Sequence, residues 1–186
     1  LMKIIMTGLL VFSILAQLSG QDEEGWYIFR GDPALNGVSQ SEFPAKPKLL
    51  WSYSAGDELR SAPVSSGRYV VAGTMSGTLF CLDNTGSLKW KFETGNGIEA
   101  PALIHKGLVY AGNLDGSMYC LDLESGKEKW SFKAENQISG SPNIWESGGR
   151  TYLVFGSYDY FLYCLDAGTG KTEWKYETDN FINGAA

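Results

Sequence analysis

Cysteine is the first residue type to consider, because thiols form disulfides, bind metals or act as nucleophiles. The chain of 186 residues has three, at Cys81, Cys120 and Cys164, and each stands between an aromatic residue and a Leu-Asp pair. No two cysteines are adjacent and none forms a Cys-x-x-Cys motif. Because metal and redox sites need such proximity, we interpret the three as small buried apolar residues.

The other reactive residue types do not form a catalytic set. The single histidine, His105, stands just before a Lys-Gly turn, and no base–orienter pair is evident around it, so we interpret it as a solvated loop residue. Four polar residues near predicted strand ends could line a funnel: Asn136, Gln137, Asn143 and Asp159. Their spacing in the sequence does not indicate that they meet at one site. The sequence therefore predicts no catalytic, cofactor-binding or metal-ligating residue.

Aspartate recurs in a turn that follows each cysteine motif, at Asp83, Asp122 and Asp166. Each turn also contains Gly and either Ser or Thr. A short carboxylate can accept hydrogen bonds from the N–H groups of its own turn, and Gly supplies the positive φ. The alternative is a ring of carboxylates that binds a cation. Because the aspartate recurs in every unit, we favour the structural role.

These motifs belong to an internal repeat of about forty residues. Four markers keep this period, namely a Trp, a small residue before Pro, a Gly after an apolar stretch and the Asp turn. The markers are Trp51, Trp90, Trp130 and Trp174; Ala62-Pro63, Ala100-Pro101 and Ser141-Pro142; Gly73, Gly112 and Gly156; and Asp83, Asp122 and Asp166. Short Gly-containing turns divide each unit into four strands.

The expected strands are short and rich in aliphatic and aromatic residues. They are 62–65, 68–74, 78–83 and 87–94 in the first unit, 100–104, 107–112, 117–122 and 127–134 in the second, and 141–145, 151–156, 161–166 and 171–178 in the third. Middle strands such as 79–82 are apolar on both faces, so each sheet must be stacked between similar sheets. Stacked four-stranded antiparallel sheets indicate an all-β fold, the β-propeller. We expect each Trp to fill space between neighbouring blades.

The third unit carries the motif Asp-x-x-Thr-Gly-Lys-x-x-Trp, from Asp166 to Trp174, preceded by an aromatic-x-Leu. This motif resembles the repeat of the pyrroloquinoline-quinone-type (PQQ-like) propellers, and the resemblance covers about residues 49–186. The segment from Trp26 to Pro33 also resembles the lead-in of exported bacterial members. The family includes quinoprotein dehydrogenases, assembly lipoproteins of the BamB type and exported proteins of unassigned role. The dehydrogenases carry an adjacent cysteine pair and BamB-type members a lipidated cysteine, and this sequence has neither.

We divide the chain into a signal peptide at 1–20, a lead-in at 21–48 and PQQ-like repeats at 49–186. Lys3, an apolar run over 4–15 and small residues after it predict a cleaved secretory signal, and hence an exported, periplasmic or extracellular protein. The alternative is an uncleaved membrane anchor, which the shortness of the run disfavours because a span needs about 20 residues.

The expected blades are about 61–94, 99–134 and 140–178, followed by the start of a fourth at 181–186. An outer-type strand at 49–55 has no partner in this pattern. We therefore expect the chain to be the N-terminal part of a propeller of about seven or eight blades. The alternative is a ring that closes by self-association of short chains.

The charge balance restricts the class of partner. Lys and Arg number 15 against 21 for Asp and Glu, a net charge of −6, which disfavours nucleic acid and anionic membrane surfaces. We predict a non-catalytic protein-binding or scaffold module of the bacterial envelope, with other envelope proteins as partners and no cofactor. One alternative is the N-terminal part of a quinoprotein dehydrogenase that uses PQQ and calcium. The other is an extracytoplasmic sensor or carbohydrate-associated module, in which Tyr158 and Tyr160 stack on sugars.

Overall fold

The structure, a computed structural model, describes residues 25–39, 41–42 and 44–186. The described residues form three four-stranded antiparallel sheets and contain no helix, which confirms the all-β prediction. No helix among them is therefore long and apolar enough to cross a membrane. The predicted signal peptide at 1–20 lies outside the described residues.

Each sheet is a meander, in which consecutive strands pair in chain order. The first sheet contains β1 (Val64–Ser65), β2 (Tyr69–Gly73), β3 (Thr78–Asp83) and β4 (Leu88–Glu93). The second contains β5 (Leu103–His105), β6 (Leu108–Gly112), β7 (Ser117–Asp122) and β8 (Glu128–Lys133). The third contains β9 (Asn143–Ser147), β10 (Arg150–Gly156), β11 (Phe161–Asp166) and β12 (Thr172–Glu177). The three sheets are the blades of the predicted propeller.

The same irregularity recurs between the two outer strands of every blade. The cysteine of the third strand lies opposite the Trp of the fourth, and the register shifts immediately after the cysteine. The pairs are Cys81 with Trp90, Cys120 with Trp130, and Cys164 with Trp174. A bulge bends and twists its strand. Each outer strand is therefore irregular beside its Trp, at the same point in each repeat.

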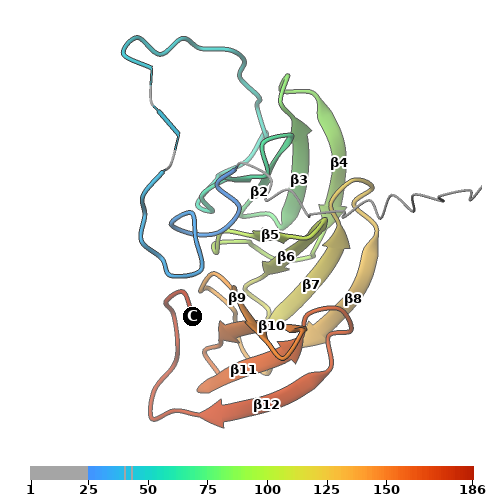
Figure 1. The fold of residues 1–186 in the computed structure, drawn as a ribbon. Coiled ribbons are helices and arrows are strands. Elements are labelled where there is room, and N and C mark those ends of the chain that lie inside the picture. Colours follow the sequence, from blue (N-terminus) through green and yellow to red (C-terminus); the bar gives the residue numbers. More distant parts are fainter. Residues whose placement is uncertain (1–24, 40, 43) are drawn as a thin grey trace, which may run out of the picture.

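The hydrophobic core lies between the blades. Figure 1 shows the three sheets one after another, with β4, β8 and β12 along one side of the stack. One buried cluster joins the first two blades and includes Val71, Leu79 and Cys81 with Val109 and Leu121. A second joins the last two and includes Tyr110, Met118 and Cys120 with Leu153 and Phe155. Burial on both faces explains why the middle strands have no polar alternation.

The lead-in crosses all three blades at their innermost strands. Its Ile28 is 1% exposed and belongs to the core cluster of the second and third blades. Three hydrogen bonds fix it: Ser65 N donates to Trp26 O at 2.8 Å, Ile104 N to Tyr27 O at 2.7 Å, and Asn143 Nδ2 to Pro33 O at 3.0 Å. The first described residues of the chain are thus tied to each blade.

The segment 49–55 differs from its prediction as a strand. It forms no strand pairing, because no neighbouring strand lies beside it in the described residues. It instead covers the free face of the first blade through Trp51, Tyr53 and Ala55. Segment 181–186 likewise contains no strand, although Ile182 N donates to Ser157 O at 3.1 Å.

Candidate functional site

The recurring Trp residues connect each blade to the next. The Trp90 Nε1–H donates to Leu123 O at 2.8 Å, and the carbonyl belongs to the residue after the Asp of the following turn. The indole lies flat on that turn, since a Cβ added to Gly126 would be 2.6 Å from the Trp90 ring. Trp51 and Trp130 make the same bond to Asn84 O and Ala167 O. The prediction that these rings fill space between blades is confirmed for Trp90 and Trp130, whereas Trp174 is 40% exposed.

The three turn aspartates hold their own backbone. Asp122 Oδ1 accepts hydrogen bonds from Ser125 N at 2.9 Å and Ser125 Oγ at 2.7 Å. Asp83 and Asp166 accept the corresponding bonds from Thr85 and Thr169. These bonds to the hydroxyl, with backbone N–H bonds and nearby cations, lower the pKa of each aspartate. In the described residues, no group of three His, Cys, Asp or Glu side chains could hold a metal ion.

The three cysteines are buried and unpaired, as predicted. Each is 0% exposed, and none forms a disulfide. Burial raises the pKa of the Cys81 and Cys120 thiols to about 12, and it also raises the pKa of Cys164. A thiol with so high a pKa is a poor nucleophile and metal ligand at neutral pH. The cysteines therefore contribute to packing.

The prediction of a solvated His105 was wrong. His105 is the last residue of β5, its side chain is 21% exposed, and its Nε2 lies 3.3 Å from Glu146 Oε1 on the third blade. Burial and, next, the positive charge of Lys106 lower the pKa of His105, although the neighbouring Glu146 acts to raise it. Sequence reasoning missed Glu146 because the two residues are far apart in the chain and meet only when the blades stack.

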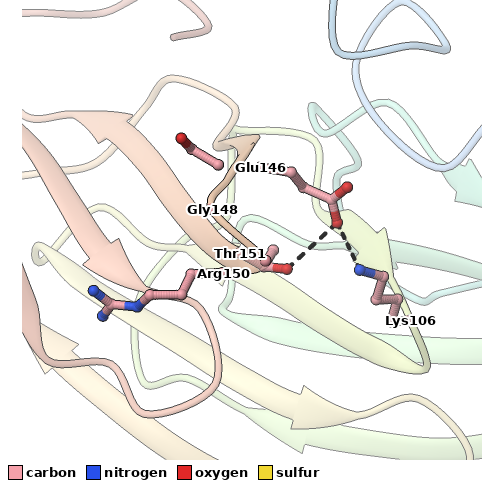
Figure 2. Close-up of a pocket in the computed structure, with 7 residues that line it drawn as sticks. Lys106, Glu146, Gly148, Arg150 and Thr151 are labelled. Carbon is pink, nitrogen blue, oxygen red and sulfur yellow. Dashed lines mark hydrogen bonds and ion pairs between the residues drawn. The ribbon is translucent and has the colours of Figure 1, made fainter.

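Glu146 is also the centre of a charged cluster beside the β9–β10 hairpin (Figure 2). Lys106 Nζ lies 2.6 Å from Glu146 Oε1, and Thr151 Oγ1 donates to the same oxygen at 3.4 Å. Arg150 points away from this group and pairs with Asp166 and Glu173 on its own blade. A cavity of about 230 Å³ is lined by Lys106, Glu146, Ser147, Gly148, Gly149, Arg150 and Thr151. The exposed Lys106–Glu146 ion pair thus joins the β5–β6 turn of the second blade to β9 of the third.

Three of the four predicted funnel residues lie together, and one lies apart. Asn136, Gln137 and Asp159 meet at the edge formed by the turn between β10 and β11. Asp159 Oδ2 accepts from Glu135 N at 2.9 Å, and Gln137 O accepts from Tyr158 N at 3.0 Å. Asn143 is the first residue of β9 and donates to the carbonyls of Pro33 and Ala186.

This edge, which we call the connector face, carries the turns between the second and third strands of each blade. The connectors between blades lie against these turns. Met75 N, Leu114 N and Tyr158 N donate to the carbonyls of Glu58, Gly97 and Gln137, each in the connector that precedes the blade. The connector face therefore presents one turn per blade, at the same position in each repeat.

The turn of the third blade departs from the repeat at Tyr160. Its counterparts, Gly77 and Gly116, have positive φ, and a Cβ on Gly77 would lie 2.6 Å from Asn96 O. Tyr160 adopts the same left-handed backbone with φ of 70° and is 48% exposed. This conformation costs a non-Gly residue about 1–2 kcal/mol. Such strain at an exposed aromatic marks a candidate site. The sequence signal is the order Gly, Gly, Tyr across three aligned turns.

Two further aromatic rings flank this turn. Tyr158 and Phe181 stack with centroids 4.6 Å apart and an interplanar angle of 12°. Phe181 is 43% exposed. The Thr178 N–H and hydroxyl both donate to Tyr160 O, at 2.7 and 2.8 Å. The third blade thus carries the stacked pair of Tyr158 and Phe181 and, two residues along the same turn from Tyr158, the exposed Tyr160. We call these three residues the aromatic turn.

The comparisons with known proteins identify the family. A family model described as outer membrane protein assembly factor BamB matches residues 43–184. The chain belongs to this BamB family. The crystal structure of BamB from Moraxella catarrhalis is 27% identical, with a TM-score of 0.60 over 70% of this chain and 41% of that one. No curated protein matches the sequence.

Two dehydrogenases share the fold of this BamB-family chain. A europium-containing methanol dehydrogenase is 18% identical, with a TM-score of 0.70 over 84% of this chain and 32% of that one. A quinohemoprotein alcohol dehydrogenase from Comamonas testosteroni is 20% identical, with a TM-score of 0.69 over 86% of this chain and 28% of that one. The chain spans less than half the length of the three solved relatives. At such identities, the dehydrogenases show the fold alone.

The predicted funnel residues of this BamB-family chain do not converge on a PQQ and calcium site. Such a site would need carboxylates and amides that converge on one anionic ring and one cation. Asn136 Oδ1 and both Asp159 oxygens instead accept hydrogen bonds from backbone N–H groups. Asn143 lies apart at β9 and is bonded to two carbonyls. These side chains are already used to fix turns and connectors.

Proposed function

We propose that this member of the BamB family is a non-catalytic protein-binding module of the bacterial envelope. The observation that carries the proposal is the match of residues 43–184 to a family described as an outer membrane protein assembly factor. The identity of 27% to BamB over 70% of the chain supports it. Its partners are other envelope proteins, and it reaches them by export to the periplasm or the cell exterior.

The distribution of side chains supports binding. The turn aspartates and the buried cysteines are engaged in turns and packing. The connector face, in contrast, presents Tyr160, which is 48% exposed. Protein interfaces are enriched in aromatic residues, because a large rigid ring buries area at low entropic cost. The connector face is therefore the surface that we assign to partners.

Affinity capture from envelope extracts tests this proposal. We expect the tagged chain to retain a specific envelope protein at physiological ionic strength. A chain with Leu114→Glu on the connector face should retain much less, whereas Lys91→Ser on the exposed outer strand β4 should retain as much as the original. Retention of no protein, or equal loss in both variants, would contradict the proposal.

A second experiment tests the dehydrogenase alternative directly. PQQ and Ca²⁺ are added to the folded protein, and quinone absorption and dye-linked alcohol oxidation are measured. We expect neither cofactor uptake nor oxidation, because the carboxylates and amides near the strand ends are bonded to the backbone. Stoichiometric uptake with turnover would replace the binding proposal by a quinoprotein function.

A further inference from the structure

We propose that the aromatic turn of the third blade binds a positively charged, extended peptide segment of the partner, with Tyr160 as its central contact. This inference rests on the proposed protein-binding function and deepens it by naming the surface and the chemistry of the partner. It rests on three observations: the departure of Tyr160 from the repeat, the neighbouring stacked rings of Tyr158 and Phe181, and the surrounding charge.

The first observation is that the fold alone does not call for Tyr at this position. The first two blades make the same turn with Gly77 and Gly116, and the turn carbonyl of the first and third blades accepts the same bond from a Thr hydroxyl. The third blade keeps the backbone conformation but carries a ring that is 48% exposed. The ring contributes exposed aromatic surface in a backbone conformation that favours glycine.

The second observation is that the neighbouring rings are held in place. Tyr158 and Phe181 stack nearly parallel, with an angle of 12°. The Tyr158 N–H is bonded to Gln137 O, and the Phe181 N–H is bonded to Asn180 Oδ1 at 2.9 Å. A guanidinium or ammonium group binds favourably over such an aromatic face, and Arg also stacks on it.

The third observation is the negative charge around the rings. Four carboxylates lie in this turn, at the end of β12 and in the connectors that contact the turn: Glu135, Asp159, Glu177 and Asp179. None of them has a basic partner within 4 Å among the described residues. The nearby Lys133 is paired with Asp115 at 3.0 Å, and Lys175 lies over the Phe161 ring. The surface is therefore acidic as well as aromatic.

Rings and carboxylates without a basic partner together favour a cationic peptide. An Arg side chain can stack on a Tyr ring while its N–H groups reach a carboxylate, so one residue uses both features. A neutral glycan would use the rings but would leave the four carboxylates without a charged partner. We therefore commit to a basic peptide, and glycan binding becomes an outcome of the test.

The test uses the whole chain, labelled with ¹⁵N, and three probes. The probes are the blocked peptide Ac-Gly-Arg-Gly-Arg-Gly-NH₂, its Glu counterpart and chitotetraose, and amide chemical shifts report the site. We expect the Arg peptide alone to shift residues 158–161 and 177–181. In Tyr160→Gly its affinity should fall at least fivefold, whereas Tyr160→Phe should bind as the original does. The thermal midpoint of Tyr160→Gly should not fall, which separates loss of binding from loss of the fold.

A charge series tests the same surface independently. The double variant Glu177→Gln with Asp179→Asn should bind the Arg peptide more weakly, and added salt should weaken binding to the original chain. Glu124→Gln, in the exposed turn between β7 and β8, is the matched control and should have no effect. Equal binding by Tyr160→Gly, equal binding of the Glu peptide, or shifts caused only by chitotetraose would each overturn the proposal.

Affinity capture separates this inference from the function on which it rests. If the original chain and Tyr160→Gly retain the same envelope protein equally, the aromatic turn is not the binding site, but the proposed protein-binding function is still supported. If the original chain retains no protein but the Arg peptide binds with the expected variant effects, the binding function fails and the surface chemistry stands.

Discussion

The turns at the two edges of the three blades differ in how strictly they keep the repeat. At one edge, the Asp turns keep the same chemistry in all three blades, with a carboxylate that accepts from Thr85, Ser125 or Thr169. At the connector face, the corresponding turns change from Gly77 and Gly116 to Tyr160. The Asp bonds that recur in every repeat fix each turn, and the Trp90 and Trp130 indoles then bond these turns to the preceding blade. Tyr160 departs from the repeat in a backbone conformation that favours glycine, and we therefore assign a binding role to this position.

Removing a recurring contact should produce the largest effect. Trp90 is 8% exposed and bonded to Leu123 O, so Trp90→Ala should lower the free energy of unfolding by about 3–5 kcal/mol. Trp174 has the same place in its blade but is 40% exposed, and Trp174→Ala should cost about 1 kcal/mol. Urea denaturation measures both. Equal losses would show that the indole-to-turn contact is not what stabilises the blade stack.

The turn glycine under the indole should come next. Gly126 has φ of 69°, and an added Cβ would lie 2.6 Å from the Trp90 ring. Gly126→Ala should therefore cost about 2–4 kcal/mol, from the left-handed backbone and from overpacking. Gly107→Ala is the control, since Gly107 has φ of 76° but no atom within 4 Å of its added Cβ. The control should cost only about 1 kcal/mol in the same urea titration.

The connector face should respond in the opposite direction. Tyr160→Gly removes the left-handed strain and should raise the free energy of unfolding by about 1 kcal/mol. Gly116→Ala makes the reverse change at the equivalent turn and should lower it, because the added Cβ meets Asn136 O. Thermal and urea unfolding measure whether each variant raises or lowers the free energy of unfolding. A loss of stability in Tyr160→Gly would mean that the ring belongs to the structure and would remove the contrast between the two edges.

The smallest effect should be the acid response of the Asp turns. Hydrogen bonds lower the pKa of Asp83, Asp122 and Asp166 in the folded state below 3.8. The unfolded chain therefore binds more protons in acid, so this stability is present above the unfolded pKa and is lost as the pH falls through the lowered values. Solvent screens these exposed groups, so the loss is small. A triple Asp→Asn variant should show a flatter dependence of unfolding free energy between pH 5 and 2.

The repeat could be predicted from the sequence because its markers depend on interactions between residues that are close in the chain. Strands β3, β7 and β11 lie at the residues expected from the sequence, Thr78–Asp83, Ser117–Asp122 and Phe161–Asp166. The turn glycines, the short apolar runs and the recurring Trp were enough to predict them. The inner strands were less well placed. The first, Val64–Ser65, is shorter than expected because pairing with its neighbour, and not composition, sets its length.

The candidate site could be predicted only in part from the sequence. Tyr158 and Tyr160 were singled out in the sequence, but the stacking of Tyr158 on Phe181 depends on the connector that follows the blade. The pairing of His105 with Glu146 was missed for the same reason, because it forms between blades. Periodicity predicts what each repeat shares. Contacts between side chains of different repeats depend on how the repeats stack.

The lead-in changes how this stack should fold. In an array of repeats, each unit normally contacts only its neighbours, so disruption at one end need not reach the other. Here a single early segment is bonded to Ser65, Ile104 and Asn143, and the last of these bonds spans 110 residues. Closing so long a loop is slow and entropically costly. The lead-in should therefore dock last and make the three units melt as one cooperative body instead of fraying blade by blade.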